Sequence, residues 1–270
     1  MTRTPTARDL TLAQILERQQ QAFLADPQPG VKIRRDRILR LKRLVLDNAA
    51  DLTEAMREDY GSRPETFSTL TDIASSIPDL DHQRGNIKKW MRPTRVSRAL
   101  EAVGFTQQVR HDPKGVVGII GPWNFPLYLT IVPAGSALGA GNRVMIRPSS
   151  VTAHTTEALC RLAPEYFAVD ELAIAGPEHG RGSDFSVLPF DHLFFTGSPG
   201  VGKSVAKDAA ENLTPVTLEL GGKNPVIVDT SADIDRAARS IASSRLVNGG
   251  QVCMCPDLSL IHISEPTRPY

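Results

Sequence analysis

Residues 218–225 read Leu-Glu-Leu-Gly-Gly-Lys-Asn-Pro and mark the point where an apolar, strand-like run meets a pair of glycines. The run over 215–220 predicts a strand, and the glycines after it allow the backbone to come close to a neighbouring group. Downstream, residues 250–253 read Gly-Gln-Val-Cys, which places a thiol in a glycine-flanked turn after an expected helix. A carboxylate (Glu219) and a thiol (Cys253) at the ends of regular elements are typical of a base and an activated nucleophile.

Outward from this stretch, the chain alternates between strands and helices from Lys114 onward. This alternation is typical of an α/β fold with a largely parallel sheet. The expected strands cover 115–120, 143–147, 171–175, 192–195 and 216–220, with a further strand at 224–228. The expected helices cover 126–138, 150–167 and 233–246.

The first third of the chain is predicted to be helical. Apolar residues at helical spacing indicate helices over 10–24 and 32–47, and a third helix that ends at Tyr60. A fourth helix is expected from Pro64 to Trp90, with Pro78 kinking or dividing it. We expect no catalytic group here. Helical periodicity then disappears, and 104–110 predicts a strand that forms half of a hairpin.

Composition and charge limit the classes of function. The 270 residues are 41% hydrophobic and 23% charged, and 31 basic against 30 acidic residues give a net charge of +1. These are globular values, and the charge suggests no nucleic-acid or membrane partner. No apolar run reaches a membrane span and the first ten residues lack the apolar core of a signal peptide, so we expect a cytoplasmic protein. Three cysteines (Cys160, Cys253, Cys255) do not make a disulfide framework, and ligand spacing predicts no metal site.

Two further motifs lie upstream of the opening stretch. Residues 121–126 read Gly-Pro-Trp-Asn-Phe-Pro, and residues 194–198 read Phe-Phe-Thr-Gly-Ser. In this order with 218–225 and 250–253, they resemble the aldehyde dehydrogenase superfamily over about residues 10 to 257. The chain looks most like the class 3 and coniferyl-aldehyde branch.

The resemblance implies an α/β fold with N-terminal helices, a Rossmann-like parallel-sheet dinucleotide domain and the start of an α/β catalytic domain. The expected divisions are a helical segment (1–92), an extended oligomerisation arm (93–112), the dinucleotide-binding domain (113–220) and a truncated catalytic domain (221–257). It also implies a homodimeric parent protein and a hydrophobic aldehyde substrate, aromatic or of medium to long chain.

The same resemblance assigns the catalytic roles. Cys253 is expected to attack the aldehyde as a thiolate, and Cys255 is expected to be structural. Asn124 and the backbone N–H of Cys253 are expected to stabilise the oxyanion. Glu219 is expected to be desolvated and to activate the water that hydrolyses the thioester. Lys223 is assigned to structure or local electrostatics.

NAD or NADP is the implied cofactor. Gly197 and Ser198 end a strand and Gly202 follows as a helix begins, so a pyrophosphate could approach closely. The resemblance adds Trp123 to the residues that bind the cofactor.

At the adenosine end, residues 147–150 read Arg-Pro-Ser-Ser where the family usually has Lys-Pro-Ser-Glu. Ser150 removes a negative charge that would repel a 2′-phosphate, and Arg147 keeps a cation nearby. We therefore expect NADP to be tolerated.

Two alternatives stay open. Residues 197–204 match the P-loop pattern in full, with a strand before and a helix after, so a P-loop NTPase is the rival reading. The other alternative is an inactive fragment of the dehydrogenase. Residues 258–270 do not match the family and look like translated sequencing-adapter sequence, so we expect a non-native tail that is excluded from the fold.

Overall fold

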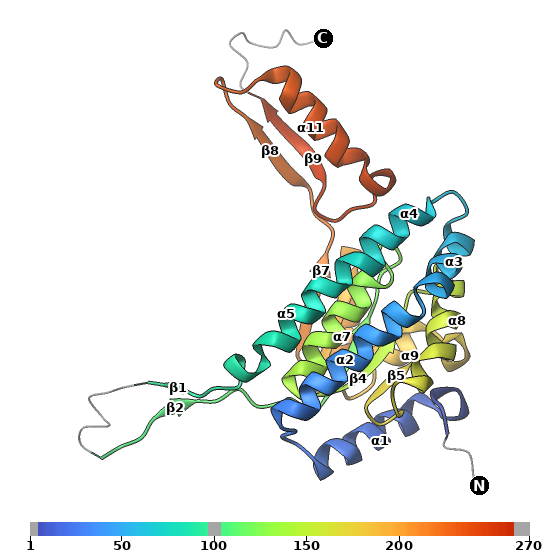
Figure 1. Cartoon of the computed structure of the whole chain (residues 1–270), viewed down its shortest axis with the longest axis vertical. Helices are drawn as coiled ribbons and strands as arrows, with labels where there is room; N and C mark the ends of the chain where they lie inside the picture. Colours follow the sequence, from blue (N-terminus) through green and yellow to red (C-terminus); the bar gives the residue numbers. More distant parts are fainter. Residues whose placement is uncertain (1–4, 97–103, 262–270) are drawn as a thin grey trace.

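A parallel sheet forms the centre of the molecule, for which a computed structural model describes residues 5–96 and 104–261 (Figure 1). Within these residues the sheet has five strands in the order β5-β4-β3-β6-β7. Their bounds are β3 Val116–Ile120, β4 Arg143–Arg147, β5 Leu172–Ile174, β6 His192–Gly197 and β7 Val216–Leu220. These agree with the expected strands to within two residues.

Both faces of the sheet are buried at β3, β4 and β5, which explains why these strands are almost continuously apolar. In β4, Val144 and Ile146 enter one hydrophobic cluster while Met145 enters the other. β5 repeats the pattern, with Leu172 and Ile174 on the first face. This alternation is the two-residue period of a β-strand.

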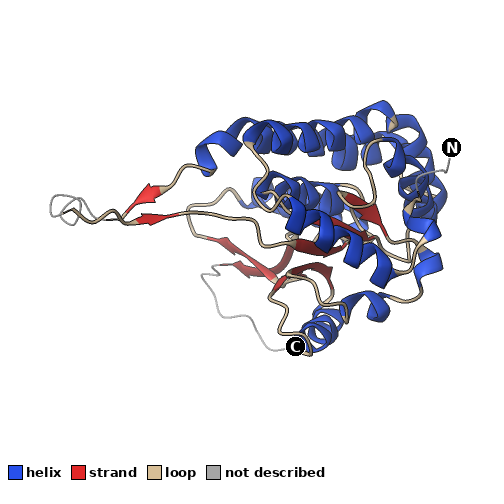
Figure 2. Cartoon of the chain, turned by 90° about the horizontal axis from the view of Figure 1, so that it is seen from below, coloured by secondary structure: helices blue, strands red, loops and turns tan. Residues whose placement is uncertain are grey.

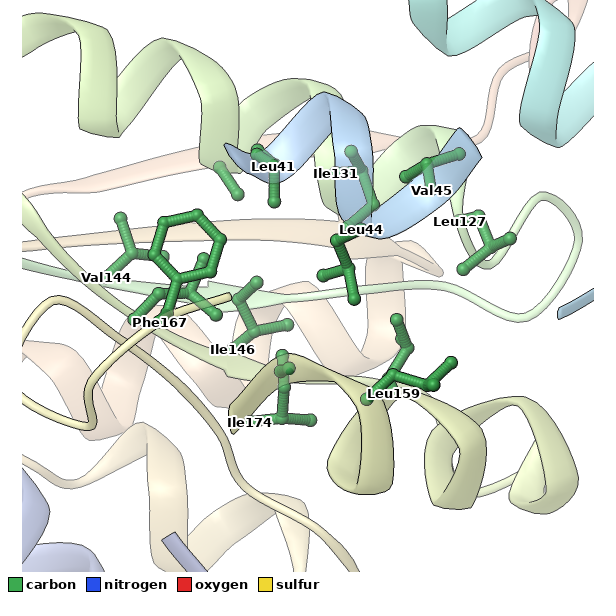
Figure 3. Close-up of a cluster of buried hydrophobic side chains, with 14 of the residues drawn as sticks. Leu41, Leu44, Val45, Leu127, Ile131, Val144, Ile146, Leu159, Phe167 and Ile174 are labelled. Atoms are coloured by element: carbon green, nitrogen blue, oxygen red, sulfur yellow. The ribbon is translucent and has the colours of Figure 1, made fainter. Parts of the chain in front are cut away.

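Helices of the first third cover one face of the sheet together with two helices that follow strands. Side chains from these helices meet the strands in the first cluster, of which ten residues are labelled in Figure 3. The helices are α2 (Val31–Asp47), α3 (Ala49–Tyr60), α5 (Ser75–Trp90), α7 (Tyr128–Ala140) and α8 (Ala153–Leu162). Three of them confirm the helices expected near 32–47, before Tyr60 and before Trp90.

The other face is covered by α1 (Leu12–Ala25), α9 (Gly182–Ser186) and α10 (Pro199–Ala210). Ile15 and Leu16 of α1, Phe185 of α9 and Val205 of α10 form the second cluster with the sheet. Short 3₁₀ turns lie at Ala7–Asp9, Ala163–Glu165, Pro177–His179 and Val247–Gly250.

The expected fourth helix is interrupted, but not at Pro78. A short α4 (Glu65–Ser68) continues into a π-helical segment, Thr69–Ala74, and then into α5, which runs through Pro78. A proline removes the N–H that would bond one turn back, and the wider π turn immediately before α5 accommodates this loss. The expected division of the helix is therefore present. Its expected position at Pro78 was wrong, because the π-helical segment ends four residues earlier, at Ala74.

Two parts extend from the main body (Figure 1, Figure 2). β1 (Thr94–Arg95) pairs antiparallel with β2 (Gln108–Val109), so the expected hairpin is present with shorter strands; residues 97–103 lie outside the described chain. Beyond β7, β8 (Asn224–Val228), α11 (Ile234–Leu246) and β9 (Pro256–Ile261) form a separate parallel βαβ unit.

β9 corrects the exclusion of everything after Asp257. Residues 258–261 pair in parallel register with β8, from Pro225↔Leu258 to Val228↔Ile261. The physical reason is that Leu-Ser-Leu-Ile is a short apolar run of strand character, which can extend the ladder from Pro256. Residues 262–270 of the expected tail lie outside the described residues.

Candidate functional site

A cavity of about 810 Å³ opens at the carboxyl ends of β3, β4, β6 and β7. The strand order reverses between β3 and β6, and in open α/β sheets ligands bind outside the carboxyl ends at such a switch point. The sequence-predicted site residues, apart from Gly202, line this one cavity: Trp123, Asn124, Arg147, Ser150, Gly197, Ser198, Glu219 and Cys253.

The thiol of Cys253 lies on a turn between α11 and β9, and its side chain is exposed. The turn is closed by a hydrogen bond from the Cys255 N–H to the Val252 carbonyl at 3.2 Å. The Asn224 side-chain amide donates to the carbonyls of Cys253 (2.8 Å) and Cys255 (3.1 Å), which ties the turn to β8. Cys255, the expected structural cysteine, is buried.

The chain reaches this turn through backbone in the left-handed region. Asn248, Gly249 and Gly250 have φ of 51°, 61° and 81°. Glycine adopts such angles without the steric cost of a Cβ, and asparagine tolerates them better than most residues. The glycines before the thiol are therefore required by the shape of the loop.

Asn124 joins the β3–α7 loop to the thiol loop. Its side-chain amide donates to the Gln251 carbonyl at 2.8 Å, and its own carbonyl accepts from the Asn248 amide at 3.1 Å. The amide that we expect to bind an oxyanion therefore lies beside the turn that carries Cys253.

The first third of the chain, in which we expected no catalytic group, holds this loop in place. Arg63 Nη1 donates to the Asn124 carbonyl at 3.0 Å, and its Nη2 pairs with Asp72 at 2.6 Å. The guanidinium also lies over the ring of Phe125, 5.5 Å from its centre. The Tyr60 hydroxyl donates to the Trp123 carbonyl.

Asp72 lies in the π-helical segment and is fully buried. Its Oδ1 accepts the N–H groups of Leu127 and Tyr128 at 3.0 and 3.2 Å, so the carboxylate caps the start of α7. Burial raises the pKa of Asp72, and the Arg63 guanidinium and these two N–H donors act in the opposite direction. In the sequence, Asp72 could have been noticed as a charged residue among apolar positions of an expected helix. Its partner Arg63 comes before that helix, so helical periodicity does not reveal the pair.

Glu219 is at the expected strand end but is not desolvated. It lies in β7, the edge strand, opposite Thr196 of β6, and its side chain is exposed. Leu220 beside it is exposed as well, so this end of β7 is in contact with solvent. The expected desolvation of Glu219 is therefore wrong for this chain.

The strand-to-helix turn after β6 has the shape needed for close approach. Ser198 is the N-cap of α10, and its hydroxyl accepts from the Val201 N–H at 3.4 Å. Gly202 is buried behind the cavity wall, where an added Cβ would lie 2.8 Å from the Leu220 side chain. The helix N-terminus thus faces the cavity, and such ends favour phosphate groups.

The same turn argues against the P-loop alternative. A P-loop wraps non-helical backbone around a phosphate, with its N–H groups pointing inward. Here α10 begins at Pro199, and the Gly202 N–H already donates to the Ser198 carbonyl at 2.9 Å. Lys203 lies within this helix, exposed, and is not among the cavity residues.

Arg147 and Ser150 have unequal access to a ligand. The Arg147 guanidinium is buried and donates to the carbonyls of Ala175, Gly176 and Gly180, and burial lowers its pKa. A guanidinium nevertheless stays charged in proteins. Ser150 is exposed at the cavity rim. A bound ligand would therefore contact residue 150 directly, and there it would meet Ser150 in place of the negative charge of the family's usual glutamate.

Metal-ligating clusters and membrane-spanning helices concern residues 5–96 and 104–261 only. These residues contain no cluster of three metal-ligating side chains, and none of their helices is both long and apolar enough to cross a bilayer.

Comparison with known proteins gives concordant matches. The model of the aldehyde dehydrogenase family matches residues 1–265. A probable coniferyl aldehyde dehydrogenase of Caulobacter vibrioides is 41% identical over 259 residues, covering 94% of this chain and 53% of that protein. The substrate-bound structure of Staphylococcus aureus AldH matches with a TM-score of 0.86 and 32% identity, over 94% of this chain and 56% of that one. An NAD⁺ complex of aldehyde dehydrogenase from Bacillus cereus matches with a TM-score of 0.78 and 26% identity, over 95% and 52%. The chain spans about half the length of the curated relatives that it matches.

Proposed function

Because the chain belongs to the aldehyde dehydrogenase family, we propose that it contributes to NAD(P)-dependent oxidation of an aldehyde to a carboxylic acid through a thioester on Cys253. The observation that carries this proposal is the single cavity lined both by the Asn124, Glu219 and Cys253 side chains and by the turn after β6. A nucleophile and a dinucleotide must share one cavity for hydride transfer, and the cavity volume suits ligands of this size.

In the proposed reaction, the Cys253 thiolate attacks the carbonyl carbon of the aldehyde. The Asn124 amide would donate to the resulting oxyanion through its second N–H, since its bond to the Gln251 carbonyl uses one of the two. The nicotinamide cofactor, when bound, supplies the hydride acceptor. Glu219 would then take a proton from the water that hydrolyses the thioester, and its exposed side chain lets that proton leave to solvent.

For the cofactor, we propose that NADP is tolerated alongside NAD. Support comes from Ser150 at the cavity rim, which puts no negative charge near a 2′-phosphate. Arg147 contributes less than its sequence position suggests, because three carbonyls already occupy its guanidinium.

The proposed substrate is a hydrophobic aldehyde of the coniferyl-aldehyde kind. This rests on the activity named for the Caulobacter relative and on the apolar side chains in the cavity wall, such as Leu129, Pro133 and Phe194. We further propose a homodimeric parent protein, with the β1–β2 hairpin as its arm. Val109 in β2 and Phe105 before it are exposed on this hairpin, as an interface would require.

Mass spectrometry of the protein incubated with NADP and a cinnamaldehyde-type substrate tests the proposal. Glu219→Gln should accumulate an acyl adduct on Cys253, because deacylation loses its base, and Cys253→Ser should carry none. Dinucleotide binding without any adduct would instead favour the alternative of an inactive fragment. An adduct on another residue would overturn the proposed chemistry.

A further inference from the structure

Two cysteines, rather than one, face the proposed reaction cavity. Cys253 is exposed and Cys255 is buried, yet both line the same wall. The dehydrogenase chemistry proposed above uses only the first sulfur. The second therefore has no role in that reaction, and its place in the wall calls for a separate explanation.

The backbone brings the two residues within the range of a disulfide. They occupy the second and fourth positions of the turn that the bond from the Cys255 N–H to the Val252 carbonyl closes. Two Cα–Cα steps of about 3.8 Å, folded back by a turn, bring the Cα atoms to about 5–6 Å, and disulfides span about 4.4–6.8 Å.

The sulfur of Cys255 is held in a defined position. Arg245 Nη1 donates to it at 2.8 Å and to the Gly250 carbonyl at 3.0 Å. The other arm of the guanidinium pairs with Asp257 at 3.2 Å, and Asp257 also pairs with Lys223 at 2.6 Å. The buried sulfur is thus fixed beside the loop that carries the exposed one.

We propose that Cys253 and Cys255 form a reversible redox pair, in which a hydroperoxide oxidises Cys253 and Cys255 then closes a disulfide. Cys253 first attacks one peroxide oxygen; the O–O bond breaks, a sulfenic acid forms and water or an alcohol leaves. The Cys255 sulfur then attacks the sulfenic sulfur, the S–O bond breaks and a second water leaves. Two thiols lose two electrons in total, and the peroxide gains them.

The disulfide would protect Cys253 from irreversible oxidation and would block it as a nucleophile. This consequence rests on the proposed function, whereas the thiol chemistry itself does not. The ring that closes is small, and strained disulfides are reduced readily, so a dithiol should restore both thiols.

Cys160 provides an internal control. It is buried in a separate cavity of about 280 Å³ between the N-terminal 3₁₀ turn and α8, where burial raises its pKa to about 11. A thiol that is neither ionised nor exposed reacts slowly with peroxide. Cys160 should therefore stay reduced under conditions that close the pair.

The test treats the reduced full chain with hydrogen peroxide, blocks free thiols and maps peptides by mass spectrometry. Trypsin leaves both cysteines in one peptide, since no Lys or Arg lies between Arg245 and Arg268. After oxidation, the mass of this peptide should fall by two hydrogens and its cysteines should resist alkylation. Treatment with a dithiol should restore the two hydrogens and both reactive thiols. In Cys255→Ser, dimedone should trap a sulfenic acid on Cys253, and sulfinic acid should form about tenfold faster than in the unmodified chain. Cys160→Ala should behave as the unmodified chain does.

Equal rates of sulfinic acid formation with and without Cys255 would overturn the proposal. A disulfide that joins Cys253 to Cys160 or to a second molecule, visible on a non-reducing gel, would overturn it as well. Dinucleotide titration of the same samples distinguishes a failure of the proposed redox pair from a failure of the proposed function. Failure to bind NAD or NADP would count against the proposed function while the thiol result stands by itself.

Discussion

Gly118 occupies the centre of β3, where the sheet packs too closely for any side chain. A Cβ at this position would lie 2.7 Å from the Phe190 ring and 2.8 Å from Leu193. We predict that Gly118→Ala lowers the free energy of unfolding by about 1–3 kcal/mol, because overpacking displaces both neighbours. Urea denaturation measures this loss.

Gly85→Ala in α5 is the matched control for that measurement. No atom lies within 4 Å of its Cβ position, and alanine favours a helix over glycine by about 0.5–1 kcal/mol. The control should therefore gain stability. If Gly118→Ala and Gly85→Ala changed the free energy of unfolding by the same amount, crowding by Phe190 and Leu193 would not explain why residue 118 is a glycine.

Residue 150 carries the cofactor prediction. Ser150→Glu places a negative charge at the exposed cavity rim, where it should repel a 2′-phosphate and accept ribose hydroxyls. We predict that the ratio of the NADP dissociation constant to that of NAD rises by about tenfold or more, which corresponds to about 1.4 kcal/mol. Calorimetry on both proteins gives the ratio, and Ser150→Gln controls for size. An unchanged ratio would refute the assignment.

At the scale of elements, Glu171 joins α2 to the start of β5. Its carboxylate pairs with Arg37 at 2.9 Å and with Arg40 at 2.7 Å, and Arg37 is almost fully buried. Burial opposes the charge on Glu171, but the hydrogen bonds and charges of Arg40 and Arg37 outweigh it and lower its pKa. The folded state therefore holds this proton less tightly than the unfolded chain.

A lowered carboxyl pKa stabilises the fold above the unfolded pKa, and this stabilisation is lost as the pH falls through the folded value. Glu171→Gln should cost about 3 kcal/mol at pH 7, because it leaves the Arg37 charge unpaired. We predict that the difference from the unmodified chain narrows as the pH falls below about 4.5. Urea denaturation from pH 7 to 3 measures it, and a constant difference would contradict this account.

The buried Arg63–Asp72 pair links the helical layer to the proposed oxyanion loop. Arg63→Met leaves the Asp72 carboxylate buried without its cation, so we predict a loss of about 3–5 kcal/mol. Asp72→Leu should cost a similar amount, since it also uncaps α7. The double variant should be more stable than the sum of the two losses implies, because it leaves no lone charge. Additive losses in thermal or urea denaturation would mean that the pair does not act as a unit.

The elements differ in how much of them can be predicted from sequence. The β4 bounds follow from an apolar run bounded by turn residues, because burial on both faces leaves a continuous signal. The π-helical segment and the Arg63–Asp72–Leu127 network could not be predicted. They depend on side chains that meet only in the folded chain, and local periodicity contains no information about such partners. Exposure of Glu219 likewise depends on what packs over the end of β7, which the local sequence does not specify.

At the scale of the whole molecule, the βαβ unit differs from the main sheet in burial. No residue of α11 is fully buried, and Ile227 of β8 and Leu246 of α11 are more than two-thirds exposed. Few buried apolar contacts imply a low free energy of local opening. We predict faster amide hydrogen exchange over 224–261 than in β3, β4 and β6, measured by mass spectrometry. Equal protection in both regions would contradict this prediction.

Binding of a dinucleotide at the switch point of the sheet is the central claim, and calorimetric titration tests it most directly. The purified chain is titrated with NAD, NADP and Mg-ATP side by side, with Gly202→Val as a variant that crowds Leu220 and Phe195 behind the cavity wall. The account predicts binding of NAD and NADP, weaker binding to the variant, and no binding of Mg-ATP. Binding of Mg-ATP alone would contradict it and would favour the P-loop alternative.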